Sequence, residues 1–209
     1  MSYQNLKSYK QAVIIADFTV AFCNRYISKF SRTVDQMTQA ARSGKQNIVE
    51  GTAVSQTSPN TELKLVGVAR GSLEELLEDY KDFLRQRGLR MWAKHDPRAL
   101  ALRQLAYADD RPDKTYTTYK TYESYKSYLD DPEEATNAMI TLINQTNFLL
   151  DRQMAAIRRQ FEERGITAES HNQRLRRNIV ESRRKNEMFD AEMQVIVEAS
   201  KKKRKQESL

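Results

Sequence analysis

The chain has 209 residues, 39% hydrophobic and 30% charged, enough for one domain with a sizeable core and an appendage but too few for two ordinary domains. It contains only six glycines and four prolines, a composition that favours long helices over a turn-rich β fold. The single cysteine, Cys23, excludes an internal disulfide, and the isolated His95 and His171 are not typical of a zinc or iron site. We therefore expect an all-α protein that needs no cofactor and holds no metal.

The amino-terminal segment MSYQNLK lacks the basic and apolar regions that make up a secretory signal. The apolar stretch from Ala12 to Cys23 is short and contains Asp17, so it is too short and too polar to span a bilayer. These features predict a soluble cytoplasmic protein that has no membrane partner.

The formal net charge is +7, and the positive excess lies at the two ends of the chain. Residues 1–57 contain seven Lys and Arg against three Asp and Glu, and residues 165–209 contain eleven against seven. Such a surface favours binding of a polyanion through release of condensed counterions, although positive charge also serves solubility. Charge alone leaves both interpretations open.

The first expected helix has apolar residues at alternating spacings of three and four, which is the pattern of a helix-bundle seam. The residues of this seam are Leu6, Tyr9, Val13, Ala16, Val20, Cys23, Ile27 and Phe30. The residues of a second apolar set, off the seam, are Ile15, Phe18, Phe22 and Tyr26. Because a bundle buries only one stripe of a helix, we expect the second set to need another partner, either the appendage or another subunit.

Two further helices follow in the next part of the chain. A capping-box pattern predicts that the second helix begins at Thr33, and Gly51 stands where a left-handed cap would end it. Ser58 followed by Pro59 predicts the start of the third helix, and Gly88 predicts its end. The apolar face of the third helix consists of Val66, Ala69, Leu73, Leu76, Tyr80 and Phe83.

Residues 89–131 interrupt this regular pattern and are expected to form a helical insertion, in which Pro97 begins a short helix. Asp131 followed by Pro132 predicts the start of a fourth long helix. Asn147 interrupts the apolar face of that helix with an amide, which either fixes the helix register through one partner or contacts a ligand. The other residues of this face are Ile140, Ile143, Leu150, Met154, Ile157 and Phe161.

Tyrosine recurs at every third position near the end of the insertion. The repeated residues are Tyr116, Tyr119, Tyr122, Tyr125 and Tyr128. On an α-helix each step of three residues turns by roughly 300°, so the rings cannot form one stripe. The repeat is a connector packed among other helices, a platform on which bases stack, or a repeat that forms no site or is a phosphorylation target.

The chain becomes strongly basic after Gly165, with the segment NQRLRRNIVESRRKNEMF and later KKKRK at residues 201–205. A loose apolar stripe predicts that part of this suffix is helical. The pattern as a whole predicts a four-helix domain over residues 1–164, interrupted by the insertion, and a basic suffix over residues 165–209.

Residues 36–51, QMTQAARSGKQNIVEG, and residues 68–80, VARGSLEELLEDY, resemble the signature of the four helix bundle protein family. That family includes proteins encoded within intervening sequences of bacterial 23S ribosomal RNA genes and the accessory variability determinant of diversity-generating retroelements. The resemblance covers the four long helices, residues 5–88 and 132–161. The insertion and the suffix resemble a longer subgroup with a C-terminal suffix domain.

The resemblance implies an up-down antiparallel four-helix bundle that associates into a homopentamer with a basic surface. In the retroelement members it also implies binding of nucleic acid and of a partner reverse transcriptase. We therefore expect a homo-oligomeric scaffold that binds RNA or DNA with weak sequence specificity, as an accessory protein to a reverse transcriptase. The alternative is a structural or adaptor oligomer that binds another protein through its suffix helix.

We expect no enzymatic activity, because the sequence shows no nucleophile beside a base, no phosphate-binding loop and no paired carboxylates at metal-binding spacing. Phosphate contacts are expected from basic residues of the first two helices and the suffix. Arg42 and Lys45 among them are alternatively part of a solvated face. The candidate residues are Lys7, Lys10, Arg25, Lys29, Arg42, Lys45, Arg174, Arg176, Arg177, Arg183, Arg184 and Lys185.

A structural network is expected around the two segments that carry the resemblance. Glu50 lies near a helix end and is costly to bury without a cation, and Arg70 is the only charge in the apolar stretch from Leu65 to Leu73. The sequence therefore predicts that Glu50 and Arg70 join Asn47 and Ser72 in an ion-pair or capping network.

Overall fold

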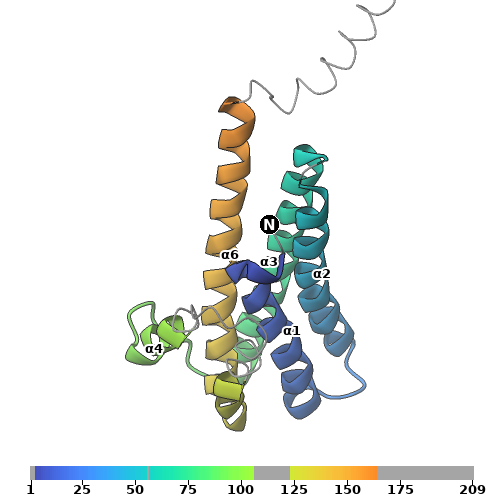
Figure 1. Cartoon of the computed structure of the whole chain (residues 1–209). Helices are drawn as coiled ribbons and strands as arrows, with labels where there is room; N and C mark the ends of the chain where they lie inside the picture. Colours follow the sequence, from blue (N-terminus) through green and yellow to red (C-terminus); the bar gives the residue numbers. More distant parts are fainter. Residues whose placement is uncertain (1–2, 56, 106–122, 164–209) are drawn as a thin grey trace, which may run out of the picture. The chain divides into compact units, whose positions relative to one another are not determined.

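The computed structural model describes residues 3–55, 57–105 and 123–163, and every regular element within those ranges is helical (Figure 1). The all-α class is confirmed for this part of the chain. The chain divides into two units, Met1–Arg158 and Arg159–Leu209, and the contacts described below lie within the first. The elements are η1 (Tyr3–Asn5), α1 (Lys7–Tyr26), α2 (Arg32–Val54), α3 (Pro59–Arg87), α4 (Pro97–Leu105), η2 (Ser127–Asp130) and α6 (Pro132–Glu163).

The side of α1 that packs into the chain carries the second apolar set. Phe18 and Phe22 are fully buried, as is Ile15. The ring of Phe22 lies edge-on to those of Tyr80 and Phe83 in α3, with centroids 5.0 and 4.8 Å apart. These aromatic contacts fix the rotation of α1 about its own axis.

The predicted seam of α1 was therefore wrong in part. Val13 is only half-buried, the exposed fraction of Val20 is 48%, and Phe30 lies beyond the end of the helix. The two apolar sets have similar spacing, so periodicity could not tell which one faces α3. Because Ile15, Phe18 and Phe22 are covered by their own chain, they need no other subunit, and the surplus apolar face expected on α1 is mostly hidden.

Helix α2 lies close against α3. It begins at Arg32 rather than Thr33, because Ser31 is the N-cap and its Oγ accepts a hydrogen bond of 3.2 Å from the Thr33 N–H. The helix continues past Gly51, which is buried, so the cap predicted there was wrong. A Cβ at Gly44 would lie 2.8 Å from the Leu73 side chain, so this glycine permits the close approach of the two helices.

The predicted ends of the later helices are confirmed. Pro59 is the first residue of α3, and Gly88 ends it in the left-handed conformation with φ of 64°. The Asp131 carboxylate accepts a hydrogen bond of 2.8 Å from the Glu134 N–H at the start of α6. None of the described helices is long and apolar enough to cross a membrane.

Polar contacts join the long helices to one another. The Thr146 hydroxyl of α6 donates to Gln11 Oε1 of α1 at 2.9 Å, and the hydroxyls of Thr19 in α1 and Tyr80 in α3 lie 3.0 Å apart. All four side chains are buried, so each pair satisfies groups that would otherwise be costly to desolvate.

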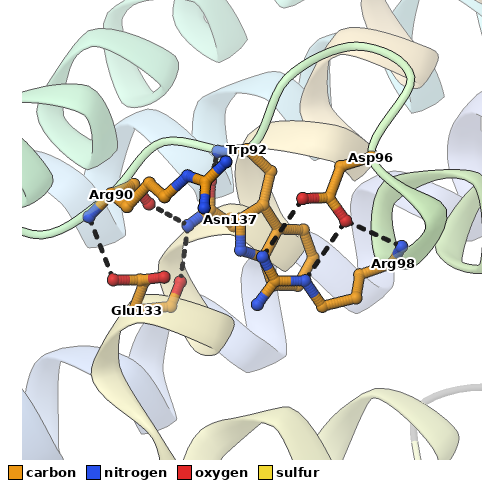
Figure 2. Close-up of polar contacts among 6 residues, drawn as sticks. All are labelled: Arg90, Trp92, Asp96, Arg98, Glu133 and Asn137. Atoms are coloured by element: carbon orange, nitrogen blue, oxygen red, sulfur yellow. Dashed lines mark hydrogen bonds and ion pairs between the residues drawn. The ribbon is translucent and has the colours of Figure 1, made fainter.

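Asn137 fastens the segment between α3 and α4 to α6 (Figure 2). Its Oδ1 accepts a hydrogen bond from the Trp92 N–H, and its Nδ2 donates to the carbonyls of Arg90 and Glu133, each at 2.8 Å. The Arg98 guanidinium carbon lies 4.3 Å from the centroid of the Trp92 ring. The start of the insertion is therefore held by one buried amide and one covered indole ring.

The tyrosine repeat is described only at its end. Tyr125 is fully buried, and its hydroxyl donates to the Leu102 carbonyl at 3.4 Å. Tyr128 is half-buried, which places one ring in the core and the next at its rim. The other repeated rings, Tyr116, Tyr119 and Tyr122, lie outside the described residues.

Candidate nucleic-acid interface

The turn between α1 and α2 holds an aromatic ring in solvent. Helix α1 ends at Tyr26, and the Ser31 N–H donates to the Ser28 carbonyl at 2.9 Å. The Phe30 N–H donates to Ser28 Oγ at 3.4 Å. These bonds define a short, ordered turn at whose tip Phe30 is 99% exposed.

Two cations flank this ring in the sequence. Lys29 and Arg32 are both exposed, and neither side chain makes a hydrogen bond or ion pair with another residue of the described ranges. An aromatic face combined with free cations is the arrangement by which proteins bind single-stranded nucleic acid, since bases stack on the ring and phosphates meet the charges.

Arg25 and Arg87 bring two more guanidinium groups to this end of the helices. Arg25 Nη1 lies 3.0 Å from Asp130 Oδ1, and both side chains are largely exposed, so the pair contributes at most about 1 kcal/mol and can exchange for a phosphate. The Arg87 guanidinium carbon lies 3.7 Å from the Phe83 ring centroid, which holds that group in place. Its Nη2 also donates to the Tyr26 carbonyl at 3.4 Å. We call Arg25, Lys29, Phe30, Arg32 and Arg87 the turn cluster.

A cavity of about 300 Å³ adjoins the turn cluster. Asp82 in its wall is paired with Arg85 at 2.8 Å, whereas Asp79 has no such partner within the described ranges. Burial, together with the negative charges of Asp82 and Glu75, raises the pKa of the Asp79 carboxyl. The cavity is lined by Ile27, Ser28, Ser31, Thr33, Met37, Asp79, Asp82, Phe83, Gln86 and Arg87.

The structure brings together only part of the predicted basic set. Arg25 and Lys29 belong to the turn cluster, whereas Lys7 and Lys10 lie in the first turns of α1. About 22 Å of helix separates Lys10 from Arg25 at 1.5 Å per residue. In α2, Arg42 is exposed and Lys45 half-buried, away from the turn. The candidates outside the described residues are Arg174, Arg176, Arg177, Arg183, Arg184 and Lys185.

The predicted structural network divides into two groups. In the first, Asn47 Nδ2 donates to the carbonyl and the hydroxyl oxygen of Ser43, at 2.9 and 3.2 Å. The Ser43 hydroxyl also lies 2.9 Å from the Ser72 hydroxyl. Asn47 and Ser72 therefore meet through Ser43, which links α2 to α3.

The second group contains Arg70, whose predicted pairing with Glu50 was wrong. Arg70 Nε donates to Asp151 at 3.0 Å and Nη1 donates to Glu74 at 2.9 Å, while Glu50 is exposed. An exposed carboxylate needs no buried cation, so nothing draws Arg70 toward α2. Asn147 finds its partner here, because its Nδ2 donates to Glu74 at 3.1 Å.

Phe30, Arg32 and Arg87 were missed as site residues from the sequence. Phe30 is in phase with the apolar residues of α1 and was therefore assigned to the seam. The available signal was local, since Phe30 stands between two cations and two serines in the stretch Ser28 to Arg32. That composition is typical of an exposed turn rather than of a helix core.

No group of His, Cys, Asp and Glu within the described ranges could hold a metal ion. Cys23 is buried in α1, and burial together with the charge of Asp79 raises the pKa of its thiol to about 11. The thiol is therefore protonated near neutral pH.

Comparisons of the chain with protein-family models, with curated proteins and with solved structures find no match. The class of protein is thus defined here by the described residues alone, as an all-α chain with a cationic and aromatic turn at one end of its helices. The resemblance to the four helix bundle protein family stays a prediction.

Proposed function

We propose that this chain is a non-enzymatic scaffold that binds single-stranded RNA or DNA through the turn cluster. The exposure of Phe30 carries the proposal, because this ring is 99% exposed in an ordered turn between two cations that lack partners within the described ranges. Exposure of one phenylalanine is not unusual by itself, and the proposal rests on its combination with the two cations, since a ring and adjacent positive charges together suit a base and its phosphates.

Different residues of the turn cluster bind different parts of the strand. A base stacks on the ring of Phe30, while Lys29 and Arg32 neutralise the phosphates on either side. Arg25 exchanges Asp130 for a third phosphate, and Arg87 is already oriented by the Phe83 ring. Contacts of this kind read little sequence and weaken steeply as salt is added.

The long helices are proposed to form the up-down antiparallel four-helix bundle implied by the resemblance, with the insertion attached to α6 and the basic suffix following it. Contacts between α1 and α3, α1 and α6, α2 and α3, and α3 and α6 support this arrangement. The association into a homopentamer and the role as accessory protein of a reverse transcriptase rest on the resemblance alone.

The alternative is an adaptor oligomer that binds another protein, through the suffix helix or through Phe30. An exposed phenylalanine also serves as an anchor in protein interfaces, and that contact would depend on apolar burial. Salt dependence separates the two functions, because stacking with phosphate contacts weakens with salt whereas an apolar anchor does not.

Replacing both flanking cations, as Lys29→Gln with Arg32→Gln, is expected to lower the affinity of the full chain for a labelled oligothymidine about 25-fold at 0.1 M salt. The reason is that loss of two phosphate contacts reduces the slope of log affinity against log salt by about 1.4 for a single strand. Fluorescence anisotropy at several salt concentrations measures both quantities.

The matched control is Arg42→Gln with Lys45→Gln, which removes the same charge from α2 outside the turn cluster. This control should change the affinity much less. An equal loss of affinity in both double variants would show that binding depends only on net charge, and would contradict the turn cluster as the binding site.

A further inference from the structure

The cavity beside the turn cluster contains a carboxylate that has no hydrogen-bond donor among the described residues. The carboxylate of Asp79 in its wall accepts no hydrogen bond from another described residue, whereas that of Asp82 is already paired with Arg85. The raised pKa of the Asp79 carboxyl agrees with this lack of a donor, since burial and the neighbouring carboxylates raise it and no cation offsets them. A suitable guest therefore presents N–H donors to the interior.

Positive charge lies next to the cavity along the chain. Ser28, Ser31 and Thr33 line the cavity, and Lys29 and Arg32 are their neighbours in the sequence, although neither lines the cavity itself. These two cations attract a guest that is negative at its outer end. An arginine side chain of another protein would satisfy Asp79 but would bring a second positive charge beside Arg87, which lines the same cavity.

We propose that this cavity binds the guanine base of a single-stranded nucleic acid, with the Asp79 carboxylate accepting hydrogen bonds from guanine N1–H and N2–H. These two donors are parallel and match the two oxygens of one carboxylate, which no other common base offers. The cavity volume of about 300 Å³ is in the range of small-molecule sites.

Arg87 completes the pocket from the α3 side. Its guanidinium is stacked on the Phe83 ring with the central carbon 3.7 Å from the centroid, and both residues line the cavity. A guanidinium plane is a surface on which an unstacked base packs. Guanine binding in this cavity rests on the proposed binding of a single strand, and it adds a preference for guanine to contacts that otherwise read little sequence.

The test compares three oligothymidines that differ at one central position, which holds thymine, guanine or hypoxanthine. We expect the full chain to bind the guanine strand about tenfold more tightly than the other two, because hypoxanthine lacks the N2 donors. Asp79→Asn should abolish this preference and leave binding of the thymine strand in place. The control is Glu78→Gln, which removes the same charge from a neighbouring residue outside the cavity lining and should keep the preference.

A second measurement on the unaltered chain compares guanosine and inosine monophosphates by calorimetry. Tighter binding of the guanosine nucleotide supports the pocket even where no strand binds, in which case only the proposed function fails. Strand binding without a guanine preference, or an equal effect of Glu78→Gln, overturns the pocket and leaves the proposed function standing. Displacement of the guanosine nucleotide by a lower concentration of an arginine peptide overturns it in favour of a protein guest.

Discussion

Replacing Phe22 by alanine is expected to lower the free energy of unfolding by about 3–5 kcal/mol, as for other large-to-small changes in a core. Phe22 is fully buried, and its ring meets Tyr80 and Phe83 edge-on, so the change removes apolar contacts and leaves a cavity between α1 and α3. Urea denaturation, followed by circular dichroism at about 222 nm as a measure of helix content, gives the loss in the free energy of unfolding.

The matched control for this prediction is Val20→Ala, because Val20 is on the same helix and belongs to the predicted seam. Its exposed fraction of 48% means that little apolar surface is lost, and the expected change is within about 1 kcal/mol. A larger loss for Val20→Ala than for Phe22→Ala would reverse the orientation of α1 described here.

Asn137→Ala is expected to lower the free energy of unfolding by about 2–3 kcal/mol, since it leaves the Trp92 N–H and the Arg90 carbonyl without their partner. The start of the insertion should also loosen from α6. Trp92 is the only tryptophan in the chain and is 8% exposed, so a shift of its fluorescence emission to longer wavelength reports that loosening directly.

Asn144→Ala provides the comparison on the same helix. Asn144 is exposed, and its Nδ2 donates to the Ile140 carbonyl at 2.8 Å, so its removal should cost less than about 1 kcal/mol and leave Trp92 emission unchanged. Unchanged emission in Asn137→Ala would show that this amide does not hold the insertion.

The all-α class and several helix ends could be predicted, because the signals that end a helix are local in the sequence. Pro59, Gly88 and Asp131 mark helix ends through a fixed backbone angle, a left-handed residue and a capping carboxylate, none of which needs knowledge of the rest of the chain. The rotation of α1 could not be predicted in this way. It depends on how Phe22 packs against α3, and that contact joins residues far apart in the sequence.

The candidate site was predicted only in part, for a related reason. Arg25 and Lys29 were found from their charge, but Phe30 changes from a core residue to an exposed one according to whether α1 continues past Tyr26. Arg87 reaches the turn only because the end of α3 packs beside it, as its bond to the Tyr26 carbonyl shows. The cavity is lined by residues of the turn, α2 and α3 together, so no single stretch of the sequence predicts it.

The most direct test of nucleic-acid binding at the turn is the affinity of Phe30→Ala for a labelled oligothymidine, set beside that of Phe148→Ala. Phe148 is also exposed, at 55%, but lies on α6 beside Arg152 and outside the turn cluster. Loss of base stacking at Phe30 should weaken binding about tenfold or more, with the Phe148 variant close to the unaltered chain. Full affinity in Phe30→Ala, or an equal loss in both variants, would contradict the account.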